Sequence, residues 1–83
     1  MQHTYPTTLR YLADNVRRQR KSLCLSQEEL ALRAAVDRTY VSQIERAVGN
    51  PSLLILCKLA EVLDADVANL LSRASDNTGS TNS

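Results

Sequence analysis

With 83 residues, the chain can form one small domain near the size at which a single core is only just sufficient, too short to add a buried enzyme cleft. No apolar run approaches the roughly 20 residues that span a bilayer, and the N-terminus lacks a signal peptide's apolar stretch, so a soluble cytoplasmic protein is expected. The net charge of +1 argues against a nucleic-acid partner, but its distribution, +3 on residues 1–46 and −2 on residues 47–83, allows one basic face.

The N-terminal part predicts a flexible leader followed by a helix. Residues 1–8 show no periodicity, and Thr7 or Thr8 can cap the helix after them. From about residue 9 to 23, apolar side chains recur every three or four positions, which indicates a first helix. Its last turns carry four cations: Arg17, Arg18, Arg20 and Lys21. Each either stays solvated near the helix C-terminus or contacts a phosphate, and the second alternative makes Arg17 a candidate contact to the DNA backbone.

A capping box predicts the start of a second helix, from about residue 27 to 35. Ser26 and Glu29, three positions apart, can each satisfy the other's backbone N–H. Leu30, Ala31 and Ala34 then form a short apolar stripe, and Leu32 falls on the opposite, exposed side. Gln27 lies in the first turn, where its amide and free backbone N–H groups could meet a phosphate or simply remain solvated.

Asp37 is a second N-cap, and it predicts a third helix from about residue 38 to 46, so that the two helices read as a helix-turn-helix. Val41, Ile44 and then Val48 face a core. The opposite arc of about 140° contains no carboxylate, with Glu45 just beyond its edge. The side chains on this arc are Arg38, Thr39, Ser42, Gln43 and Arg46.

This arc is either an ordinary solvated face or a surface that reads DNA. A guanidinium can fork onto guanine, an amide can pair with adenine, and small hydroxyls fit close to a base or a phosphate. Tyr40 lies at the boundary of the two arcs, where it is either half-buried core or a hydroxyl that reaches a phosphate.

The C-terminal half predicts two more helices. Gly49-Asn50-Pro51 is a turn signal, and Ser52 caps a fourth helix over residues 53–63. Leu54, Ile55 and Val62 lie off its main apolar stripe, and a helix that is apolar nearly all round is buried on more than one side, most simply by a second copy of the chain. Asp66 can cap a short fifth helix from 67 to about 72, and residues 73–83 are expected to be disordered.

The two cysteines predict no metal or catalytic site. Cys24 and Cys57 are 33 residues apart, and His3 is the only histidine. A zinc site needs more ligands than this, and a Cys–His catalytic pair would need the leader. We therefore expect reduced thiols that serve as small buried apolar residues, with no cofactor and no catalytic residue.

Residues 9–71 resemble the Cro and phage-repressor helix-turn-helix family, whose spacing they keep over four consecutive helices. The matching segments are LSQEELA at 25–31, DRTYVSQIER at 37–46, NPSL at 50–53 and LAEVL at 59–63. Within the family, the chain looks most like the controller proteins of restriction–modification systems, small dimeric regulators of their own gene and of the endonuclease gene. An antitoxin-like or phage-repressor-like regulator, whose fourth and fifth helices bind a protein partner, is the alternative.

The resemblance implies an all-α, lambda-repressor-like bundle of five helices within residues 9–72. It places the third helix in the major groove of a palindromic operator, bound by a homodimer. The base-reading positions fall on Arg38, Thr39, Ser42 and Gln43, and the backbone contacts on Gln27, Arg46 and Asn50, with Tyr40 at the backbone or a deformed base step. The dimer contact falls on the fourth and fifth helices, at Leu54, Ile55, Val62, Val67 and Leu70.

The implied partners are double-stranded DNA and a second copy of the chain, with no membrane and no small-molecule ligand, in the bacterial or phage nucleoid. RNA polymerase would join them if the protein activates transcription. Where the family usually has glycine, this chain has Cys24, Ala35 and Ala47. A left-handed backbone at each would cost on the order of 1 kcal/mol.

Overall fold

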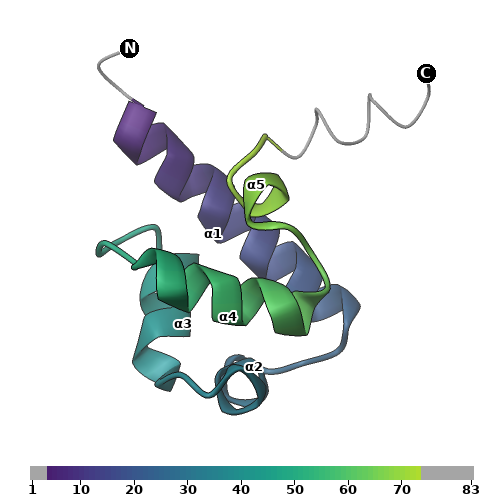
Figure 1. Ribbon diagram of the computed structural model, residues 1–83. Coiled ribbons are helices and arrows are strands. Elements are labelled where there is room, and N and C mark those ends of the chain that lie inside the picture. The colour runs from purple at the N-terminus through teal and green to yellow at the C-terminus, as the bar shows by residue number, and fades with distance from the viewer. Residues whose placement is uncertain (1–3, 74–83) are drawn as a thin grey trace, which may run out of the picture.

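The computed structural model describes residues 4–73, which form five helices and no strand (Figure 1). The helices are α1 (Thr4–Ser22), α2 (Gln27–Ala34), α3 (Arg38–Glu45), α4 (Leu53–Leu63) and α5 (Val67–Leu70). The all-α bundle is therefore confirmed. None of these helices is long and apolar enough to cross a membrane. Apart from Arg73, the tail predicted over residues 73–83 lies outside the described part of the chain.

The first helix begins five residues earlier than the sequence predicted, so the expected leader is wrong for residues 4–8. Pro6 is tolerated there because the N–H groups of a first helical turn have no helical acceptor. The hydroxyl of Tyr5 donates a hydrogen bond of 2.8 Å to the carbonyl oxygen of Gly49, which holds this end of α1 against the loop before α4. Thr7 and Thr8 lie inside the helix and do not cap it.

An aliphatic core lies between α1 and the other helices. Figure 1 shows α4 crossing in front of α1. In this view α5 lies beside α1 above α4, and α2 and α3 lie below α4. Four side chains from four helices are fully buried: Val16, Leu30, Val41 and Leu59. Burying an aliphatic side chain of this size contributes about 1.5–3 kcal/mol. Because each of α1 to α4 supplies one of them, the helices are stable only as a set.

Helices α1 to α4 all end at a left-handed residue that is not glycine. These residues are Cys24, Ala35, Ala47 and Asp64, with φ of 59°, 59°, 58° and 55°. At each end, the N–H of the next residue donates back to a helix carbonyl five positions earlier, at 3.0–3.1 Å. This bond satisfies a carbonyl that the helix itself leaves free. The left-handed backbone considered from the sequence is present at the first three positions, and Asp64 adds a fourth.

Three side chains predicted to be buried are exposed. Cys24 and Cys57 are free thiols on the surface, because one lies in the turn after α1 and the other on the outer side of α4. Val48 is also exposed, since α3 ends at Glu45 and the helical phase that put Val48 on the core side does not continue.

The left-handed alanines predict a stabilising substitution. Ala35→Gly and Ala47→Gly should each raise the free energy of unfolding by about 0.5–1 kcal/mol. Glycine removes the clash of Cβ in the left-handed conformation, and this gain exceeds the larger conformational entropy that glycine loses on folding. Urea denaturation measures the change. The control is Ala31→Gly within α2, which should lower the free energy of unfolding by about 1 kcal/mol from helix propensity and further by loss of a buried methyl group. A loss of stability in Ala35→Gly would contradict the strain argument.

Candidate nucleic-acid interface

The starts of α2 and α3 are fixed by side chains, as the sequence predicted. The N–H of Glu29 donates to Ser26 Oγ at 3.0 Å, and the N–H of Ser26 donates to Glu29 Oε1 at 2.8 Å. At α3, the N–H of Thr39 donates to Asp37 Oδ1 at 2.8 Å. These backbone donors hold the pKa of Glu29 and of Asp37 below their ordinary values. The helix-turn-helix therefore begins each helix at a defined residue.

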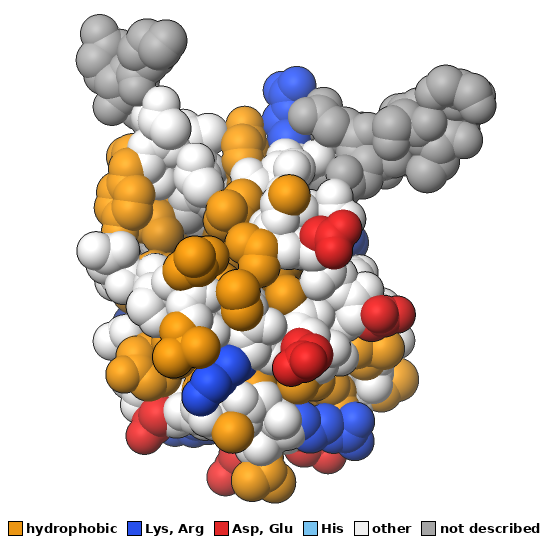
Figure 2. All heavy atoms as spheres, viewed as in Figure 1, with side chains coloured by type: hydrophobic (Ala, Val, Ile, Leu, Met, Phe, Trp, Pro, Cys, Tyr) orange, Lys and Arg blue, Asp and Glu red, His pale blue; other side chains and the backbone are white. Residues whose placement is uncertain are grey.

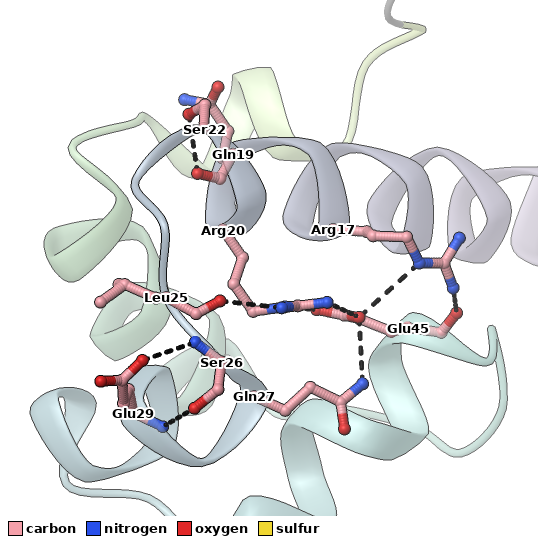
Figure 3. Close-up of polar contacts among 9 residues, drawn as sticks. All are labelled: Arg17, Gln19, Arg20, Ser22, Leu25, Ser26, Gln27, Glu29 and Glu45. Atoms are coloured by element: carbon pink, nitrogen blue, oxygen red, sulfur yellow. Dashed lines mark hydrogen bonds and ion pairs between the residues drawn. The ribbon is translucent and has the colours of Figure 1, made fainter.

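A buried carboxylate joins α3 to α1 and α2 (Figure 3). Glu45, in the last turn of α3, is only 3% exposed. Arg20 of α1 binds it with two parallel hydrogen bonds, Nε to Oε2 at 2.6 Å and Nη2 to Oε1 at 2.9 Å. The same guanidinium donates through Nη1 to the carbonyl oxygen of Leu25 at 2.8 Å, which also fixes the chain entering α2. Such bidentate pairs are the strongest and most directional of protein ion pairs.

Two predicted DNA-backbone contacts also touch this carboxylate. Gln27 donates through Nε2 to Glu45 Oε1 at 3.0 Å. Arg17 donates through Nη2 to the main-chain carbonyl of Glu45, and its Nε lies 3.7 Å from Glu45 Oε1. Figure 3 shows both side chains directed toward the end of α3. Contact of either residue with DNA stays a prediction, but both have an internal role that the sequence did not indicate.

The basic cluster of α1 is therefore largely used inside the protein. Arg17 and Arg20 bind Glu45, and Arg18 donates through Nη2 to Asn15 Oδ1 at 2.8 Å. These three side chains therefore have internal partners that the sequence did not indicate, and contact of Arg17 with a phosphate stays a prediction. Glu45 could have predicted this internal role, because a carboxylate at the edge of an otherwise uncharged core face needs a cation from another helix.

The charges around Glu45 keep it ionised in spite of its burial. Burial raises the pKa of this carboxyl, but the hydrogen bonds from Arg20 and Gln27 and the nearby positive charges outweigh it, so the pKa lies below its ordinary value. The hydrogen bond to Glu45 in turn raises the pKa of Arg20. The pair is therefore permanently charged near neutral pH and keeps α3 in place.

The face of α3 that points away from the core is accessible. Arg38, Thr39, Arg46 and Asn50 are exposed, and Ser42 and Gln43 are half-buried. Arg46 donates weakly, at 3.4 Å, from Nε to the carbonyl oxygen of Ser42 one turn back. Tyr40 is partly exposed at the border of the face, as expected. The structure thus brings the predicted base-reading side chains together on one surface.

A second surface, the α4–α5 face, is apolar (Figure 2). Figure 2 shows hydrophobic side chains gathered over α4 and α5, with acidic side chains to one side. Leu54 is 63% exposed there, and Leu54, Cys57 and Val67 line an open groove of about 460 Å³. Ile55 and Val62 are half-buried against the core. Leu70, predicted to lie at the dimer contact, is 1% exposed and belongs to the core, because α5 turns this side chain toward α1.

Asn15 is a buried polar residue whose role the sequence did not predict. It is 2% exposed, and its Nδ2 donates to the carbonyl oxygens of Asn69, Leu70 and Ser72 at 3.1, 2.9 and 2.6 Å. These carbonyls are at the end of α5, where a helix leaves its acceptors free. An asparagine three residues after Leu12 on the core side of α1 was the available signal. Its amide fastens α5 to α1.

Within residues 4–73, no group of three or more His, Cys, Asp or Glu side chains could hold a metal ion. The predicted surfaces are therefore one polar face on α3 and one apolar face on α4 and α5.

Comparison with known proteins relates most of the bundle to regulators. The helix-turn-helix family matches residues 16–70. Control protein C.SmaI of Serratia marcescens is 44% identical over 62 residues, covering 75% of this chain and 74% of that protein.

Two solved structures share both the fold and much of the sequence. The restriction–modification controller protein C.AhdI of Aeromonas hydrophila has a TM-score of 0.70 and 39% identity, covering 75% of this chain and 94% of that one. SinR of Bacillus subtilis, a master regulator of biofilm formation solved in complex with DNA, has a TM-score of 0.69 and 39% identity, covering 74% of this chain and 98% of that one.

The Glu45 cluster predicts how stability falls in acid. Because the pKa of Glu45 is lower in the folded chain than the unfolded value of about 4.3, its ionised form stabilises the fold above that pH, and this contribution is lost as the pH falls through the folded pKa. Glu45→Gln should lower stability at pH 7 by about 1–3 kcal/mol and should lose less than the parent between about pH 5 and 3. Thermal melts over this range test it, with Glu28→Gln, an exposed carboxylate on α2, as the control. Equal acid slopes for Glu45→Gln and the parent would refute the role of Glu45.

Proposed function

This chain belongs to the helix-turn-helix family of Cro and phage-repressor type, and from that membership we propose that it is a homodimeric transcriptional regulator that binds specific DNA sequences through α3. The observation that carries the proposal is the exposed face of α3, which has donors and acceptors for base edges and no carboxylate to repel phosphates. SinR, a relative with the same fold, has been solved with DNA bound. An α-helix of this width fits the major groove.

The roles divide according to what each side chain can reach. Arg38, Thr39, Ser42 and Gln43 read base edges in the major groove. Arg46, Asn50 and Tyr40 contact the sugar–phosphate backbone beside them, and Gln27 and Arg17 add donors at the start of α2 and on α1. Contacts to the sugar–phosphate backbone fix the position and orientation of the protein on the duplex, whereas the α3 side chains supply the sequence preference.

Similarity to two controller proteins supports a narrower role. The protein would bind a palindromic operator, with half-sites about one helical turn or ~34 Å apart, upstream of its own gene and of restriction–modification genes. Genes for a methyltransferase and an endonuclease next to its own would support this role, and footprinting of the upstream DNA tests it. Binding without sequence preference at moderate salt would refute specific regulation.

Two arginines on α3 should differ in what they contribute. Arg38→Ala should relax base preference at one operator position and cost about 1–3 kcal/mol on the preferred duplex, because a fork to guanine is lost. Arg46→Ala should weaken all duplexes similarly and reduce the salt slope by about one, because a phosphate contact is lost. Titrations of preferred and random duplexes at several salt concentrations separate these outcomes. If Arg38→Ala weakens both duplexes equally, its assignment to base reading is wrong.

We propose that the α4–α5 face binds a second copy of the chain. Leu54 is 63% exposed on this face, and Ile55, Val62 and Val67 continue the surface from positions that also support the core. The groove beside Leu54 is also lined by the charged residues Lys58, Glu61 and Asp66. Removal of the exposed leucine from water by a partner is favourable. Two copies joined here would present two α3 helices, which matches the symmetry of a palindrome.

Leu54→Glu tests the interface without disturbing the core. The substitution should convert the dimer into a folded monomer, because it puts two carboxylates into one apolar contact. The matched control is Leu32→Glu on α2, at a leucine that is 79% exposed and outside this face, which should leave the dimer intact. Sedimentation gives the mass and circular dichroism the fold. A dimeric Leu54→Glu chain would reject this interface, and a monomeric parent that becomes ordered only with a co-expressed protein would favour a different partner for the same face.

A further inference from the structure

The loop between α3 and α4 is tied to the opposite end of the chain. Tyr5, in the first turn of α1, donates its hydroxyl to the carbonyl oxygen of Gly49 at 2.8 Å, across 44 residues of sequence. Gly49 has φ of +83°, in the left-handed region that glycine adopts without strain. The hydrogen bond therefore holds the residue at which the loop changes direction.

The backbone of Gly49 packs against the side chain of Gln43, one of the proposed base-reading residues. A Cβ atom at Gly49 would lie 3.3 Å from Gln43 Oε1 and 3.8 Å from its Cβ and Cδ, so the amide of Gln43 packs along the bare backbone there. The N–H of Val48 also donates to the carbonyl oxygen of Gln43 at 3.0 Å. A movement of Gly49 toward α3 would push the amide of Gln43 aside.

Two small pockets share Asn50 and Pro51 of this loop as lining residues. On one side, Tyr5 and residues of α1 and α4 line a hollow of about 100 Å³ together with Asn50 and Pro51. On the other side, Tyr40 and Gln43 line one of about 40 Å³ with the same Asn50 and Pro51. Asn50 and Pro51, directly after Gly49, thus border open space on both sides, and the Tyr5 hydrogen bond restrains the loop from the side of α1.

We infer that Tyr5 is a positioning residue for base recognition, acting through Gly49 on Gln43 and on the neighbouring Asn50. This inference rests on the proposed function. A glutamine pairs with adenine only when its amide plane aligns with two atoms of the base, so a small displacement costs specificity. Asn50 comes directly after Gly49, so the same restraint sets where its amide meets a phosphate. The first turn of α1 thereby controls a surface that it does not itself form.

Removing one hydroxyl tests this role. A duplex is first selected from a random-sequence pool with the parent protein. Tyr5→Phe should then bind this duplex roughly twofold to tenfold more weakly, the loss typical of one hydrogen bond, and should lose discrimination at the base pair where Gln43→Ala loses it. Tyr11→Phe, elsewhere on α1, is the matched control and should change neither property. Thermal melts should show a folded chain for all three variants.

The combined variant distinguishes positioning from general stability. In the Gln43→Ala background, Tyr5→Phe should no longer change base preference at that position, because the two side chains act through one contact. Additive effects in the double variant, or an unchanged base profile for Tyr5→Phe, would overturn the inference while leaving specific binding by the parent intact. A parent that selects no sequence at all would instead reject the proposed function.

Discussion

The carboxylate of Glu45 sets the geometry on which the recognition surface depends. A buried charge costs several kcal/mol in lost hydration, and here it is offset by a bidentate arginine, an amide and a second arginine from two other helices. Loss of Arg20 would cost about 3–5 kcal/mol, because the charge of Glu45 would stay buried without its bidentate partner. Since the contacts come from α1 and α2, the orientation of α3 is set before DNA is present. A surface arranged in advance loses less conformational entropy on binding.

The sequence predicted the helices whose starts are decided locally. Ser26, Asp37 and Ser52 each bond a backbone N–H two or three residues further on, so the rule that identifies them needs no knowledge of the fold. The start of α1 was missed because its restraint is the contact between Tyr5 and Gly49, which lie 44 residues apart. Composition alone gave residues 4–8 no reason to be helical.

The candidate site was predictable in its outward-facing part only. Periodicity separates Arg38 and Thr39 from Val41 because a helix has two sides. It cannot tell which neighbouring element covers an apolar side chain, so Leu54 and Leu70 were given the same role although one is exposed and the other is in the core. It also cannot pair Glu45 with Arg20, since that pair exists only after α1 and α3 pack.

The hydrogen bonds from Asn15 to the end of α5 affect how the molecule folds. A helix of four residues cannot persist alone, because nucleation costs more than its few hydrogen bonds return. Here the acceptors at its end are satisfied by an amide on α1, and Leu70 is inserted beside it in the core. The α4–α5 face therefore forms in the same cooperative unit as the bundle beneath it. A chain in which α5 is not yet fastened to α1 therefore lacks the part of the α4–α5 face that Val67 supplies.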